Sequence, residues 1–139
     1  VQDLVSIDSN IRALSLAAAD SHSKKAQAPV YVFLFNWKSP TPRGIIGSVH
    51  GLEIPFVFNT TQLEGHLISQ DDKQAQALAE KMSDAWVSFA KTGRPAAKGL
   101  PTWDAYDTQK GATMLFDNTC EMRYHFDKAL QAILTDFLQ

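Results

Sequence analysis

The clearest pattern of hydrophobic and polar positions runs from residue 70 to residue 91. Apolar residues recur there at the spacing of one helical face, at Ala75, Leu78, Ala79, Met82, Ala85, Trp86, Phe89 and Ala90. Ser69, with Asp72 three positions later, is typical of a capping box. Gly93 is suited to a left-handed helix end. The pattern predicts an amphipathic helix whose aromatic side chains belong to a core.

Four further segments have a recognisable pattern. Residues 30–35 form an unbroken apolar run between two prolines, which is typical of a strand covered on both faces in a parallel sheet. Residues 113–117 predict a short strand, and residues 126–138 predict a closing helix. A first helix is expected over residues 7–20, ahead of a polar loop or frayed helix end, from the spacing of Ile7, Ile11, Leu14 and Ala18. This order of elements predicts an α/β fold.

Two strands are too few to cover a run that is apolar on both faces, because sheets average about five or six strands. We therefore expect residues 1–139 to be a single partial domain of a larger sheet, or a chain that completes its sheet by oligomerising. The chain starts at Val1 without a methionine, which favours a processed or truncated product. A bare strand edge promotes pairing with a second copy, so self-association of the chain is expected.

Composition and charge exclude several classes of function. Thirteen basic and fifteen acidic residues give a net charge of −2, so no basic surface for nucleic acid is expected. The longest apolar run, residues 30–35, is far shorter than the roughly twenty residues of a membrane span. Cys120 is the single cysteine and is interpreted as a structural thiol. The scattered His22, His66 and His125 predict neither a metal site nor a cofactor site.

Residues 44–58 read GIIGSVHGLEIPFVF and closely resemble the loop that bears the catalytic histidine in the type-B carboxylesterases. That family includes para-nitrobenzyl esterases and cholinesterases. Residues 30–37 resemble the strand before this loop, and residues 82–95 resemble the following helix with its T-G-x-P ending. Residues 103–117 resemble the family's final strand and its approach. The family usually has Gly where this chain has Asn59, and Asn tolerates left-handed backbone angles.

The resemblance implies an α/β-hydrolase fold, with this chain as a C-terminal fragment that supplies the last strands of the central sheet and their flanking helices. It puts His50 in the histidine position of a triad that runs Ser, then Asp or Glu, then His. Neither a G-x-S-x-G elbow nor an H-G-G-G run occurs in the sequence. The nucleophilic serine, the triad acid and the oxyanion loop are therefore expected before Val1, and the chain alone is predicted to be inactive.

In this interpretation His50 is the general base and then the general acid of a carboxylesterase that hydrolyses small-molecule esters. Imidazole suits this role, because its unperturbed pKa of about 6.5 allows proton exchange at neutral pH. Gly47 and Gly51 let the backbone on either side turn tightly. Glu53 either steadies the loop by hydrogen bonds or is an ordinary solvated glutamate. Phe56 and Phe58 are better suited to core packing than to lining a substrate pocket.

One alternative function stays open at this stage. Some proteins that resemble this family lack the serine and act as non-catalytic, cholinesterase-like adhesion or scaffold domains, and the deciding serine lies outside this sequence. The retained His50 in its Gly-flanked loop favours the enzyme. The expected partners are an ester substrate and the missing N-terminal portion of the same enzyme. A single cysteine, where secreted animal cholinesterases have several, favours a bacterial, cytoplasmic protein.

Overall fold

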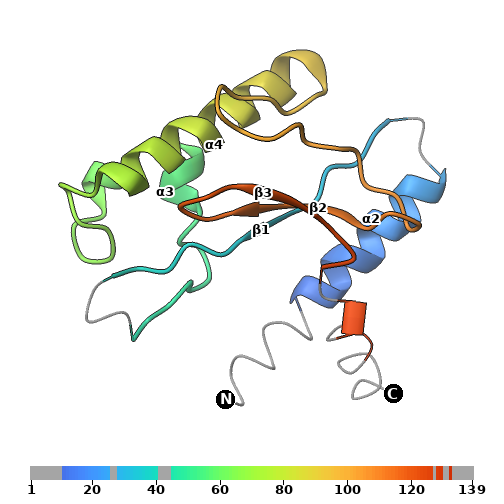
Figure 1. Cartoon of the computed structure of the whole chain (residues 1–139), viewed down its shortest axis with the longest axis horizontal. Coiled ribbons are helices and arrows are strands. Elements are labelled where there is room, and N and C mark those ends of the chain that lie inside the picture. The colour runs from blue at the N-terminus through green and yellow to red at the C-terminus, as the bar shows by residue number, and fades with distance from the viewer. Residues whose placement is uncertain (1–10, 26–27, 41–44, 127, 130–131, 133–139) are drawn as a thin grey trace. The chain divides into compact units, whose positions relative to one another are not determined.

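The computed structural model describes residues 11–25, 28–40, 45–126, 128–129 and 132 (Figure 1). The chain divides into two compact units. The first, which we call the histidine unit, comprises residues 33–103 and 114–122, and the second, the terminal unit, comprises residues 1–32, 104–113 and 123–139. Most of the predicted closing helix lies outside the described residues, although residues 128, 129 and 132 are helical.

The sheet has three strands in the order β1-β2-β3, namely Phe33–Phe35, Ala112–Phe116 and Glu121–Tyr124 (Figure 1). β1 and β2 run parallel, with Phe33 beside Met114 and Phe35 beside Phe116. A parallel pair needs a long crossover connection, which the intervening helices supply here. The short connection between β2 and β3 instead makes an antiparallel hairpin. The arrangement confirms the predicted α/β class.

β1 is shorter and more exposed than the sequence predicts. Only Phe33–Phe35 of the expected strand over residues 30–35 is paired, and Phe33 is 37% exposed. The described sheet gives β1 a single neighbour, so its second edge and part of its faces stay uncovered. β2 lies between two strands, and all five of its residues are buried. Within the described residues the run is therefore not covered on both faces, and its burial in a larger sheet stays a prediction.

α4 (Lys73–Thr92) is the predicted amphipathic helix with a different start. Asp72, not Ser69, is the N-cap, and its side chain accepts hydrogen bonds from the backbone N–H groups of Gln74 and Ala75, both at 2.9 Å. A carboxylate in this position satisfies two free donors and lies at the positive end of the helix dipole. Gly93 has a φ of 72° and ends the helix as predicted.

Aromatic rings from α4 and from the parallel strands form one cluster in the histidine unit. The Trp86 ring centroid lies 5.0 Å from that of Phe33 and 6.0 Å from that of Phe116. Trp103 adds an edge-to-face contact with Phe116 at 5.4 Å. Such contacts are favourable beyond the burial of apolar area alone. They hold α4 against the sheet and place Trp86 in a core as predicted, whereas Phe89, the other aromatic residue of this face, is 46% exposed.

α2 (Ala13–Lys25) forms the helical part of the terminal unit. It continues through the segment expected to be a loop or frayed end, because its alanine-rich sequence favours helix and His22, Lys24 and Lys25 complement the negative end of the dipole. The predicted inward face is wrong, since Leu14 is 70% exposed whereas Ala19 is buried. Residues 7–10 of the expected helix lie outside the described residues.

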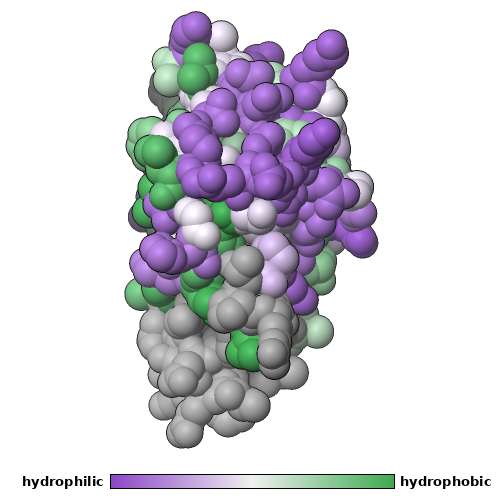
Figure 2. Space-filling view, turned by 90° about the vertical axis from the view of Figure 1, so that its left-hand side faces the viewer, coloured by the Kyte–Doolittle hydropathy of each residue, from purple (hydrophilic) through white to green (hydrophobic). Residues whose placement is uncertain are grey.

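Several large apolar side chains are exposed on both units. The most exposed are Leu14, Ile45, Phe58 and Leu63, at 70–82%. On the face drawn in Figure 2, hydrophobic residues in green lie among hydrophilic residues in purple. Within the described part of the chain, no helix has both the length and the apolar character needed to span a membrane.

Candidate functional site

His50 lies in a tight turn on the surface of the histidine unit. The N–H of Leu52 donates to the carbonyl oxygen of Val49 at 3.1 Å, which closes a four-residue turn with His50 and Gly51 at its centre. Gly51 has a φ of 83°, and the third position of a type II turn requires such a positive φ. The imidazole is exposed. The sequence expectation of a tight turn around His50 is thus confirmed.

Hydrogen bonds anchor this turn at the carboxyl end of β1. The hydroxyl of Ser48 donates to the carbonyl oxygen of Phe35, the last residue of β1, at 3.1 Å. Gly47, which precedes Ser48, is also anchored, because its carbonyl oxygen accepts a hydrogen bond from the N–H of Ser39 at 3.1 Å. The hydroxyl of Ser39 in turn donates to the carbonyl oxygen of Leu67. Gly47 has a φ of 68°. Carboxyl ends of parallel strands are where α/β sheets present functional groups.

A buried aromatic layer includes the helix that follows the turn. Phe56 of α3 (Ile54–Val57) is 0% exposed, and its ring centroid lies 4.9 Å from that of Phe35 and 5.0 Å from that of Trp37. Leu52, which closes the turn, is 3% exposed. Phe56 therefore packs in the core as expected. Phe58 does not, because it is 71% exposed.

Glu53 connects the histidine turn to α3. Its backbone carbonyl accepts hydrogen bonds from the N–H groups of Phe56 and Val57, both at 3.0 Å, and it occupies the N-cap position without a side-chain cap. The residue is half-buried. Its backbone thus starts the helix that carries Phe56, while the role of its carboxylate stays a prediction.

Cys120 and His125 lie in surroundings that differ from those of His50. Cys120 is buried, and burial raises the pKa of its thiol, partly offset by a hydrogen bond to the carbonyl oxygen of Asp117 at 3.6 Å. A thiol with a raised pKa is a poor nucleophile. His125 bonds through Nε2 to the carbonyl oxygen of Gln109 in the terminal unit. Within the described residues, no three His, Cys, Asp or Glu side chains come together as a metal site.

An exposed imidazole on an anchored turn can exchange a proton with a hydroxyl brought to it. The geometry confines the position of His50, since Ser48 ties the turn to β1 and Glu53 joins the turn to α3, which carries the buried Phe56. The sequence identified His50, Gly47 and Gly51, but it missed the anchoring serines Ser39 and Ser48. Serine is common in loops, and their carbonyl partners lie far away along the chain, so no local signal could have revealed them.

Comparison with known proteins extends this picture. A model of the Carboxylesterase family matches residues 1–133. The chain is 33% identical over 107 residues to a para-nitrobenzyl esterase of Bacillus subtilis, covering 76% of this chain and 21% of that protein. It is 31% identical over 110 residues to a liver carboxylesterase of Sus scrofa, covering 76% and 18%. The chain thus spans about a fifth of the length of these relatives.

Solved structures agree with this family. An esterase of the anaerobe Clostridium hathewayi, described as able to hydrolyse aliphatic aromatic polyesters, superimposes with a TM-score of 0.69 at 30% identity. The match covers 78% of this chain and 21% of that one. A thermophilic para-nitrobenzyl esterase gives a TM-score of 0.75 at 26% identity over 86% of this chain and 24% of its own. These matches confirm the α/β-hydrolase fold, and the chain belongs to the carboxylesterase family.

Proposed function

We propose that this chain supplies the triad histidine, His50, of a serine carboxylesterase of which it is the C-terminal part. Membership of the carboxylesterase family supports the reaction class. The observation on which the assignment of His50 rests is its exposed ring, in a turn tied by Ser48 to the carboxyl end of a parallel strand. That is the location at which this kind of sheet presents catalytic groups.

In the proposed mechanism, the imidazole of His50 accepts the proton of a serine hydroxyl as the serine attacks the ester carbonyl. A free hydroxyl is a weak nucleophile at neutral pH and needs such a base. The same ring then gives the proton to the departing alkoxide, so the alcohol leaves and an acyl-enzyme remains. Water then attacks the acyl-enzyme. His50 accepts the proton of the water and returns it to the serine, and the carboxylic acid is released.

The partners of His50 in this mechanism are proposed to precede the chain. These are the serine on its elbow, the carboxylate that orients the second ring nitrogen, and the N–H donors of the oxyanion hole. The chain spans about a fifth of its relatives, which leaves room for them. Exposed apolar side chains such as Ile45 and Phe58 also suit a chain that packs against further protein.

Two hydrolysis measurements test the proposal. The isolated chain should hydrolyse p-nitrophenyl acetate no faster than its His50→Ala variant, because neither a G-x-S-x-G serine elbow nor an H-G-G-G oxyanion run occurs in it. The full-length protein should turn the ester over and show a burst of p-nitrophenol from acylation. A full-length protein that folds but neither hydrolyses the ester nor reacts with an organophosphonate would support the adhesion or scaffold alternative instead.

A further inference from the structure

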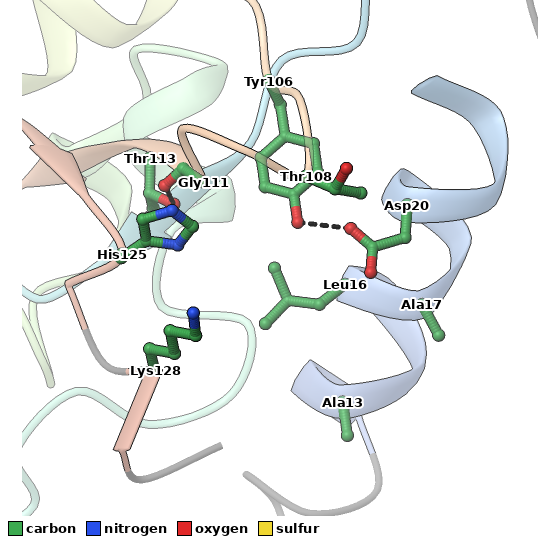
Figure 3. Close-up of a pocket in the computed structure, with 10 residues that line it drawn as sticks. All are labelled: Ala13, Leu16, Ala17, Asp20, Tyr106, Thr108, Gly111, Thr113, His125 and Lys128. Carbon is green, nitrogen blue, oxygen red and sulfur yellow. Dashed lines mark hydrogen bonds between the residues drawn. The ribbon is translucent and has the colours of Figure 1, made fainter. Parts of the chain in front are cut away.

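A pocket in the terminal unit lies away from the histidine turn in the sequence and has no role in the proposed hydrolysis. Its volume is about 340 Å³, within the range of small-molecule sites. α2 forms one wall, and the loop before β2 and the segment after β3 form the other (Figure 3). All lining residues belong to the same unit. The lining residues are Ala13, Leu16, Ala17, Asp20, Tyr106, Thr108, Gly111, Thr113, His125 and Lys128.

The pocket contains one carboxylate and one lysine ammonium group on different walls. Asp20 extends from α2, and its Oδ1 accepts a hydrogen bond from the hydroxyl of Tyr106 at 2.5 Å (Figure 3). A carboxylate can accept about four hydrogen bonds, so Asp20 retains acceptor capacity for a ligand. Lys128 reaches in from the other wall, and Leu16 projects from α2 as an apolar surface (Figure 3).

Backbone contacts fix the wall that bears Lys128. The N–H of His125 donates to the carbonyl oxygen of Gly111 at 3.2 Å, and the N–H of Lys128 donates to the carbonyl oxygen of His125 at 3.3 Å. His125 has a φ of 47°, a strained value that non-glycine residues adopt mainly where the surroundings impose it. A Cβ atom at Gly111 would lie 2.6 Å from Nδ1 of His125. The ring is thus seated directly on this glycine.

Each charged residue is anchored to its own wall. Tyr106, whose N–H donates to the carbonyl oxygen of Val30 at 2.7 Å, keeps the Asp20 carboxylate in place, and the bonds through His125 hold the backbone of Lys128. Two opposite charges with an aliphatic surface beside them favour a ligand that carries both charges. We propose that this pocket binds a small apolar amino acid, whose carboxylate contacts Lys128 and whose ammonium group contacts Asp20.

The aliphatic part of that ligand would lie against Leu16 and the adjacent alanines of α2. This site goes beyond the proposed esterase function and uses none of its residues. Ester hydrolysis could therefore fail as a proposal while this binding site stands, and the reverse also holds. A binding measurement on the 139-residue chain distinguishes the two, because it needs no turnover.

Three probes with one hydrocarbon skeleton test the proposal: leucine, isocaproate, which lacks the ammonium group, and isoamylamine, which lacks the carboxylate. Nuclear magnetic resonance titration of the 15N-labelled chain should show saturable shifts of the Gly111 and Thr113 amides with leucine. Removing either charged group from the ligand should weaken binding about tenfold or more, so leucine should bind at least about tenfold more tightly than either analogue. Equal affinities, or no saturable shift with leucine, would overturn the proposal.

Two substitutions test which side chain contacts which charged group of the ligand. Asp20→Asn keeps an acceptor for Tyr106 and should weaken leucine binding about tenfold while leaving isocaproate binding unchanged. Lys128→Gln should weaken leucine binding similarly and leave isoamylamine binding unchanged. Lys110→Gln, at an exposed lysine outside the pocket, is the matched control and should change nothing. A control as damaging as Lys128→Gln would contradict the assignment. If a variant does not fold, the ligand series on the unsubstituted chain still tests whether both charged groups of leucine contribute to binding.

Discussion

Replacing Phe56 with alanine should destabilise the layer beneath the histidine turn more than most single substitutions. The side chain is 0% exposed and contacts the rings of Phe35 and Trp37 at centroid distances of 4.9 and 5.0 Å. Truncating a buried phenylalanine removes its transfer free energy and leaves a cavity, at a cost of about 3–5 kcal/mol. A domain has only about 5–15 kcal/mol of stability in total, so the loss is large.

Urea unfolding followed by tryptophan fluorescence measures this cost, because Trp37 is 2% exposed and reports directly on the layer. With a typical m-value of about 2 kcal/mol/M, the unfolding midpoint should fall by about 2 M. Phe58→Ala is the matched control. The side chain of Phe58 is 71% exposed, so its removal should change the free energy of unfolding by no more than about 0.5 kcal/mol. Equal costs for the two variants would refute this account of the support layer.

Three further predictions concern other parts of the chain. Asp72→Ala removes the cap of α4 and should lower the free energy of unfolding by about 0.5–2 kcal/mol, a loss that urea titration would detect and that should not accompany Asp71→Ala. Gly111→Ala should cost at least about 1–2 kcal/mol, because φ is 56° there and the new methyl would meet the His125 ring; a neutral effect in thermal unfolding would contradict that packing. The hydrogen bond to Asp104 at 2.7 Å raises the pKa of the Tyr124 phenol, so ultraviolet titration should show it ionising above the usual value of about 10, and Asp104→Asn should lower it. The small stabilisation from this bond is present below the unfolded-state pKa and is lost as the pH rises through the folded-state pKa.

Sequence patterns were sufficient for the elements whose periodicity and end signals agree. α4 combines an apolar face, an acidic N-terminus and Gly93, and its prediction missed which side chain caps it and that Phe89 is exposed. Asp72 outcompetes Ser69 because it lies next to the first free N–H groups. The positive φ of 52° at Asn59 likewise follows from the side chain's tolerance of that region.

The failures have a common physical cause, which is that local patterns do not reveal what lies beside an element. The apolar run at residues 30–35 predicted a six-residue strand, but only Phe33–Phe35 is paired with β2. β3 has too few apolar residues to be predicted from the sequence, and it forms because it pairs with β2. The face of α2 was misassigned because contacts in the terminal unit favour Ala19 over Leu14.

The turn around His50 was predictable from sequence because the residues that form it make a short, ordered motif. His50, Gly47 and Gly51 are close together in the chain, and the turn that they form follows from local backbone geometry. Its attachment to β1 through Ser48 depends on a contact between segments, which spacing alone does not encode. The pocket of the terminal unit escaped prediction for the same reason, since its walls come from three separate segments.

The most direct test of the central claim is the ratio of kcat/KM values for full-length protein with and without His50→Gln, measured with p-nitrophenyl acetate. His22→Gln, at an exposed histidine of α2, is the control. Loss of a triad histidine lowers kcat by about 10⁴–10⁶-fold in serine hydrolases, and we expect a loss of that order for His50→Gln alone, with an unchanged melting temperature. A folded His50→Gln enzyme that retains more than about a tenth of the activity would contradict the assignment of His50 as the catalytic base.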